Sequence, residues 1–174
     1  MFACGDKVVY RHHVCEIAAL REAYFEGRDY LELHALFEKS LKLFVAVDEA
    51  KPPACRTVMT REEALALIDT IGGLKPLHTE IAEAPGAPAL LERHLRETYE
   101  AHLKTFTPQD LVLVLQSAHL RTVERQAQGR NATSTDKRYF DMAESFLCDE
   151  LALSLDMPRE DTKAYLESYL GYDA

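Results

Sequence analysis

The stretch Thr60-Arg61-Glu62-Glu63-Ala64-Leu65 marks the point where strand-like sequence gives way to helix-like sequence. A threonine at a helix N-cap accepts a hydrogen bond from the amide three residues later, and a glutamate at that position reaches back to the threonine amide. Thr60 and Glu63 have this spacing, so we expect a helix to begin here. We expect it to end near Ile71, because Gly72 and Gly73 suit the left-handed conformation that closes a helix.

The sequence before Thr60 is expected to form a small β-barrel. β-Branched and aromatic residues recur there between turn signals, and the predicted strands are residues 6–10, 14–24, 30–37, 41–47 and 55–58. Alternation directs Leu31, Leu33, Ala35, Leu41, Leu43 and Val45 to the core. It directs Lys42 and Phe44 outward, unless the register is shifted by one residue. Five short antiparallel strands joined by tight turns favour a barrel.

The sequence after Thr60 is expected to be helical. Prolines and glycines between residues 74 and 87 indicate an irregular linker. Further helices are predicted over 91–106, 111–128, 136–155 and from Pro158 onward, with Thr107 as one N-cap and Ser134 or Thr135 as another. The expected fold is therefore α+β. A barrel domain with its following helix spans residues 1–73, a linker spans 74–87, and an all-α domain of about four helices spans 88–174.

Composition limits the functional classes. The chain has 174 residues, of which 47% are hydrophobic, and it shows neither a signal peptide nor an apolar run long enough to span a bilayer. We therefore expect a soluble, cytoplasmic protein that does not bind membranes. The net charge of −9 disfavours nucleic acid in general. However, residues 93–138 carry eight Lys and Arg against five Asp and Glu, so this stretch could face DNA.

Neither a metal site nor an enzyme active site is expected. Cys4, His12, His13 and Cys15 are close in sequence but lack the paired spacing of a structural zinc site, so the protein should fold without metal. The sequence contains no GxSxG, P-loop, GxGxxG or HExxH motif. We therefore expect a protein that is not an enzyme and that needs no cofactor.

Two blocks of sequence resemble a known family. They are Gly5-Asp6-Lys7-Val8-Val9-Tyr10, followed by His12 and His13, and the block 136–153, which begins after Thr135 and ends in Asp149-Glu150-Leu151-Ala152-Leu153. Together with the change from strands to helices, they resemble the CarD/CdnL family of bacterial transcription regulators over nearly the whole chain. The resemblance implies a Tudor-like N-terminal domain that binds the β subunit of RNA polymerase. It also implies a helical domain that touches promoter DNA at the upstream edge of the transcription bubble.

Two sets of site residues are expected. The expected polymerase-binding residues are Arg21, Tyr24, Lys42 and Phe44. The expected DNA-contacting residues are Arg93, Leu95, Arg96, Arg121, Arg125, Lys137 and Arg138.

The chain also departs from the family. Relatives insert a tryptophan at the bubble edge, whereas this chain has no tryptophan and aligns Leu95 there, with Glu97 and Glu100 where relatives are basic. Phe44 replaces an arginine found in some relatives, and Ala46 replaces a proline. We therefore predict a transcription regulator that binds polymerase through its barrel and modulates promoter opening, with weak, nonspecific DNA binding by the chain alone. The alternative is a protein-binding adaptor with the same barrel that has lost its DNA contact.

Overall fold

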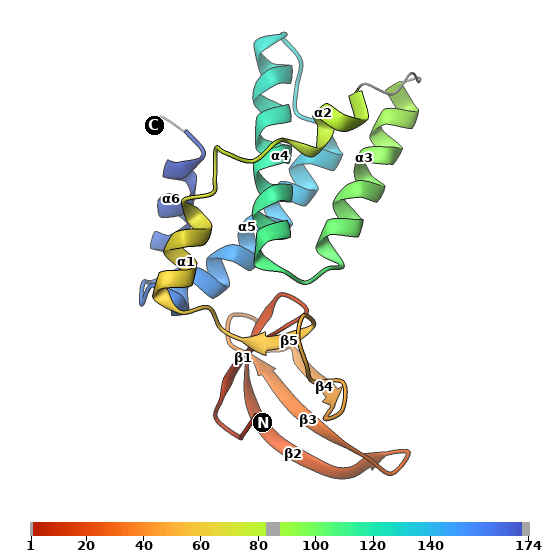
Figure 1. The fold of residues 1–174 in the computed structure, drawn as a ribbon, viewed down its shortest axis with the longest axis vertical. Helices are drawn as coiled ribbons and strands as arrows, with labels where there is room; N and C mark the ends of the chain where they lie inside the picture. Colours follow the sequence, from red (N-terminus) through yellow and green to blue (C-terminus); the bar gives the residue numbers. More distant parts are fainter. Residues whose placement is uncertain (1, 83–87, 172–174) are drawn as a thin grey trace. The chain divides into compact units, whose positions relative to one another are not determined.

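The computed structural model describes residues 2–82 and 88–171 and shows an α+β protein (Figure 1). The chain divides into two compact units, residues 1–60 and 61–174. We refer to them as the strand unit and the helical unit. In the described residues, none of the helices is both long and apolar enough to cross a membrane.

The strand unit contains one antiparallel sheet of five strands in the order β4-β3-β2-β1-β5. The strands are β1 (Lys7–Tyr10), β2 (His13–Phe25), β3 (Arg28–Ala35), β4 (Lys42–Ala46) and β5 (Cys55–Thr57). Each agrees with its predicted counterpart to within two residues at either end. Turn signals and alternation were therefore sufficient to locate every strand of the described sheet.

The sheet is open, which corrects the prediction of a closed barrel. β4 and β5 lie at opposite edges, and within the described part of the chain each pairs with a single neighbour. β5 has only three residues, whereas β2 and β3 form a long, curved hairpin (Figure 1). Strand count follows from local patterning, but closure requires pairing between the first and last strands in the sheet, which no local pattern specifies.

One face of the sheet carries the hydrophobic core of the strand unit. The inward prediction for Leu31, Leu33 and Ala35 is confirmed, since all three are buried. Their burial comes from the period-two alternation of side chains along β3. The buried cluster consists of Val8, Tyr10, Cys15, Ile17, Leu31, Leu33, Ala35, Val45 and Cys55.

The helical unit contains six helices in its described residues: α1 (Arg61–Ile68), α2 (Leu77–Ala82), α3 (Pro88–Leu103), α4 (Pro108–Ala127), α5 (Ser134–Ser154) and α6 (Arg159–Tyr169). α4 and α5 run side by side, and α3 and α6 pack on them (Figure 1). Thr107 caps α4 as predicted, because its side chain accepts a hydrogen bond from the Asp110 amide. For α5 the cap is Thr133, one residue before the expected position, and it bonds the Asp136 amide.

Helix α1 belongs to the helical unit, which corrects the predicted boundary at residue 73. It packs on α4 and α5, and the Arg61 guanidinium donates to the Leu155 carbonyl at 2.9 Å. The predicted linker is also partly structured, because α2 lies within it and Gln116 of α4 bonds both the Gly72 amide and the Leu74 carbonyl. Residues 83–87 of that linker lie outside the described part of the structure.

Candidate functional site

The four predicted polymerase-binding residues lie on one face of the strand unit. We call this the outer face, meaning the side of β2, β3 and β4 opposite the buried cluster. Leu31 and Leu33 point into the core, so the residues between them on β3 point the other way. In these registers, β2, β3 and β4 each contribute one residue to three rows across the outer face. The rows are Glu16–His34–Lys42, Ala19–Glu32–Phe44 and Arg21–Tyr30–Ala46.

Aromatic rings form the centre of this outer face. Tyr24 stacks on Phe44, with ring centroids 5.1 Å apart and planes inclined by 8°. Tyr30 meets Tyr24 edge-on at 5.9 Å. Phe44 is 39% exposed and Tyr24 is 55% exposed, so the predicted outward orientation of Phe44 is confirmed. Exposed large aromatic rings grouped in this way are typical of protein-binding surfaces.

A buried carboxylate organises the polar side chains around these rings. The side chain of Glu32 is only 8% exposed; it accepts a hydrogen bond from Arg21 Nε at 2.8 Å and forms an ion pair with Arg21 Nη2 at 2.5 Å. His34 Nε2 lies 2.7 Å from the other carboxylate oxygen. The hydrogen bonds to His34 and Arg21 lower the pKa of Glu32, so it stays ionised at neutral pH. The Arg21 side chain remains half exposed, with its guanidinium fixed in orientation.

Strand β4 offers an open edge beside the outer face. The Ala35 amide donates to the Leu41 carbonyl and the Val47 amide donates to the Asp29 carbonyl, so residues 41 and 47 bond toward β3. Because bonding direction alternates along an antiparallel strand, the backbone groups of Lys42 and Phe44 point to the other side. No strand covers that side in the described residues. The edge can therefore accept an added strand.

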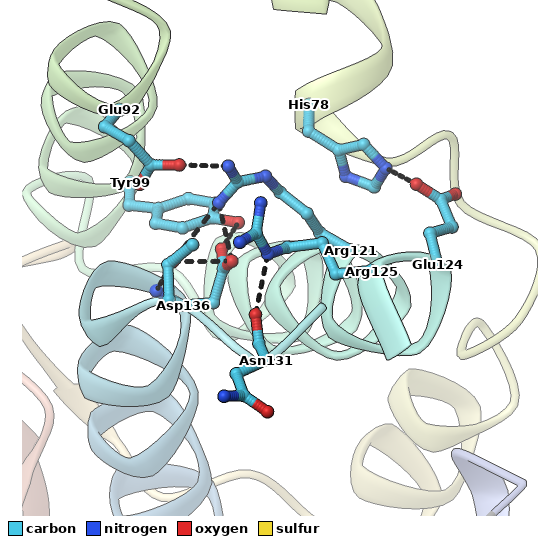
Figure 2. A network of polar contacts seen from close by, with 9 residues as sticks. His78, Glu92, Tyr99, Arg121, Glu124, Arg125, Asn131 and Asp136 are labelled. Atoms are coloured by element: carbon cyan, nitrogen blue, oxygen red, sulfur yellow. Dashed lines mark hydrogen bonds and ion pairs between the residues drawn. The ribbon is translucent and has the colours of Figure 1, made fainter. Parts of the chain in front are cut away.

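Two of the predicted DNA-contacting residues are buried in the helical unit, which corrects their assignment to a surface. Leu95 has no exposed area, so it is a core residue of α3 and does not form an exposed wedge. Arg121 is 6% exposed and donates to Asp136 Oδ2 at 2.5 Å, while its other terminal nitrogen pairs with Glu92 (Figure 2). The positive charge of Arg121 is therefore paired with two carboxylates inside the protein.

The buried network around Arg121 joins three helices. Asp136 has no exposed area, and its carboxylate accepts a hydrogen bond from Tyr99 at 3.2 Å (Figure 2). It also accepts one from the Thr133 hydroxyl at 2.8 Å. Burial and the neighbouring Asp136 charge raise the pKa of Tyr99, so its phenol remains a hydrogen-bond donor. This network holds α3, α4 and α5 together at the start of α5.

The other predicted basic residues lie at or near the surface but do not all present a free charge. Arg93 pairs with Glu97, and Arg125 donates to the Asn131 carbonyl (Figure 2). Arg96, Lys137 and Arg138 are exposed. Arg138 stacks over the Tyr139 ring at 5.7 Å, and burial together with a bond to Glu100 raises the pKa of Tyr139 to about 12. Arg138 therefore lies on the surface between α3 and α5, beside Tyr139, whose hydroxyl bonds the acidic side chain of Glu100.

Metal-binding side chains do not assemble in the described residues, where no group of three His, Cys, Asp or Glu is placed to hold an ion. Cys4 is exposed, whereas Cys15, Cys55 and Cys148 are buried. Burial raises the pKa of the Cys15 thiol to about 12 and those of Cys55 and Cys148 to about 11. These buried thiols are therefore unreactive at neutral pH.

Glu32 and His34 are part of the site although the sequence analysis did not select them. Alternation along β3 could have shown that both face away from Leu31 and Leu33. It could not have shown that Arg21 reaches Glu32, because that contact depends on the register of β2 against β3 and on the irregularity between Ile17 and Ala19.

No protein-family model matches the chain, and no curated protein is significantly similar to it.

Proposed function

We propose that this protein is a transcription regulator whose outer face binds the β subunit of RNA polymerase. In this proposal the strand unit is a Tudor-like module, and the helical unit modulates promoter opening. One observation carries the proposal: the four residues expected to bind polymerase, Arg21, Tyr24, Lys42 and Phe44, lie on one exposed face of the strand unit.

The chemistry of the outer face suits a protein partner. The Tyr24–Phe44 stack supplies exposed aromatic area, while Arg21 and Lys42 supply donors around it. The open edge of β4 adds backbone groups that a partner strand could pair with. Aromatic and arginine side chains that become buried in an interface contribute a large share of its affinity.

Capture of bacterial core RNA polymerase by the full chain tests the proposal. Truncating Phe44 to alanine should weaken capture about thirty-fold or more, since an interface aromatic contributes about 2 kcal/mol. The melting temperature should change little, because Phe44 is exposed and lies outside the buried cluster.

Phe37 provides a matched control for this experiment. It is 38% exposed, close to the 39% of Phe44, but it lies between β3 and β4. Phe37→Ala should therefore capture polymerase at wild-type strength. Equal loss of capture in both variants, or wild-type capture by Phe44→Ala, would exclude the outer face as the binding site.

The second candidate is an adaptor that keeps the protein-binding face and does not contact DNA. The burial of Leu95 and Arg121 favours it, because both are unavailable to a ligand. The helical unit also carries 12 Lys and Arg against 20 Asp and Glu. Its expected behaviour is polymerase capture with no duplex binding even at low salt.

Duplex binding measured against salt concentration separates the two candidates. The regulator should bind DNA weakly, with an affinity that falls steeply as salt rises. Charge reversal of both Arg96 and Arg138 should weaken this binding further, because both side chains are exposed and neither forms an ion pair with an acidic side chain among the described residues.

A further inference from the structure

An apolar pocket lies on the core side of the strand unit, beyond the end of the buried cluster. Its volume is about 350 Å³, within the range of small-molecule sites. Leu20 and Leu31 form its floor, and they are directly opposed on β2 and β3. Leu20 is 47% exposed and Val47 is 43% exposed, so the pocket opens to solvent between them.

Two separate segments form the walls of this pocket above the β2–β3 floor. The N-terminal segment is held by the Ala3 amide, which donates to Asp6 Oδ2 at 2.8 Å, and by the Gly5 amide, which donates to the Ile17 carbonyl at 2.8 Å. The opposite wall follows β4 and is held by the bond from the Ala50 amide to the Ala46 carbonyl at 3.0 Å. The pocket therefore forms part of the folded unit and does not depend on a single loop.

The chemistry of the lining restricts what can bind. The residues that line it include Phe2, Cys4, Leu20, Leu31, Val47 and Ala50, and among the described lining residues none carries a charged side chain. A charged ligand group inside the pocket would lose its hydration without gaining an ionic partner, whereas an apolar group would gain by leaving water. We propose that this pocket is a binding site for a small, uncharged, apolar molecule. The site is separate from the outer face and does not depend on the proposed function.

Cys4 provides a direct readout, because it lines the pocket and is exposed while Cys15, Cys55 and Cys148 are buried. With indole as the probe, saturating concentrations should slow alkylation of Cys4 by iodoacetamide several-fold in the full-length protein. Indole should also cause saturable amide shifts confined to residues near the pocket. Benzoate should bind at least about tenfold more weakly than indole, because its carboxylate meets no cation in the lining.

Two matched variants locate the site. Leu20→Gln makes the floor polar, and the half-exposed position of Leu20 makes the change compatible with folding. It should weaken indole binding about tenfold. Phe44→Gln makes a comparable change on the outer face and should leave indole binding unaltered. The proposal is overturned if indole produces neither protection of Cys4 nor saturable shifts, or if folded Leu20→Gln binds indole as tightly as the wild type.

Discussion

At the scale of single residues, Glu32 defines the chemistry of the outer face without being accessible itself. It fixes the Arg21 guanidinium and the His34 imidazole in place. An arginine whose orientation is set before binding loses less conformational freedom when a partner arrives. We infer that Glu32 acts as a positioning residue for the outer face, and that Arg21 and the aromatic stack supply the contact.

The tight turn between β2 and β3 gives a prediction about one residue. Glu26 and Gly27 both have positive φ, at 50° and 70°, in a two-residue connection that prefers Asn-Gly. Glu26→Asn should therefore stabilise the hairpin, because asparagine adopts a positive φ more readily than glutamate does. Slower amide hydrogen exchange in β2 and β3 would show this.

Gly27→Ala provides the opposite control at the same turn. An added Cβ would meet no atom within 4 Å, so any cost arises from the left-handed backbone and not from a clash. This variant should exchange faster than the wild type. Faster exchange in Glu26→Asn as well would contradict the assignment of the turn.

The buried network gives a second prediction about one residue. Arg121→Ala should destabilise the helical unit by about 3–5 kcal/mol, because it leaves the buried Asp136 carboxylate without its cationic partner. Urea unfolding followed by helical circular dichroism measures the change. Arg125→Ala, four residues later, removes one bond to a carbonyl and should cost about 1 kcal/mol or less.

At the scale of elements, the structure shows what periodic sequence patterns can predict. Alternation located β3 and β4 and identified Phe44 as outward, because each strand obeys a local rule. The six-residue helix α2 was missed, because Pro76 and the later prolines indicated a linker and the helix is too short to show an apolar period. A contact with another helix holds α2 in place, since the Ser117 hydroxyl of α4 accepts a hydrogen bond from the Leu77 amide at 3.0 Å.

Helix α3 shows why one candidate site residue was wrongly selected from the sequence. Leu95 lies on the buried apolar stripe of α3, together with Tyr99 and Leu103. Its assignment as a DNA wedge came from family alignment and conflicted with the stripe. The local apolar pattern was the better guide, because burial of a leucine is favoured by roughly 1.5–3 kcal/mol.

The connection between α3 and α4 gives a prediction about pH. Burial alone would raise the pKa of Asp110, but hydrogen bonds from Thr105, His102 and Thr107 lower it below its usual value. Its stabilising contribution should therefore be complete above the pKa of the unfolded state, near 4, and should be lost as pH falls through the folded pKa.

Unfolding free energies of the wild type and Asp110→Asn measure this contribution. The wild type should be the more stable at pH 7, and the difference should shrink as the pH falls well below 4. A difference that stays constant over this range would show that the Asp110 charge does not contribute.

At the scale of the whole molecule, charge is divided unevenly between the two units. The strand unit carries eight Lys and Arg against nine Asp and Glu, so nearly all of the net charge of −9 belongs to the helical unit. Such a unit repels phosphate at long range, and DNA contact would have to rely on a small local surface. Protein binding through the nearly neutral strand unit carries no such penalty.

The boundary at residue 60 leads to a last prediction, about which fragment folds. Leu67 and Ile68 of α1 are buried within the helical unit, and Arg61 bonds the end of α5. A fragment of residues 61–174 should therefore unfold cooperatively in urea, whereas a fragment of 74–174 should be less stable by several kcal/mol, since it loses two large buried side chains worth about 1.5–3 kcal/mol each. Ile68→Ala in the full chain should lower the stability of the helical unit by about 2–5 kcal/mol. Equal stability of the two fragments would instead place α1 with the strand unit, because the helices after residue 73 would then form a complete core without it.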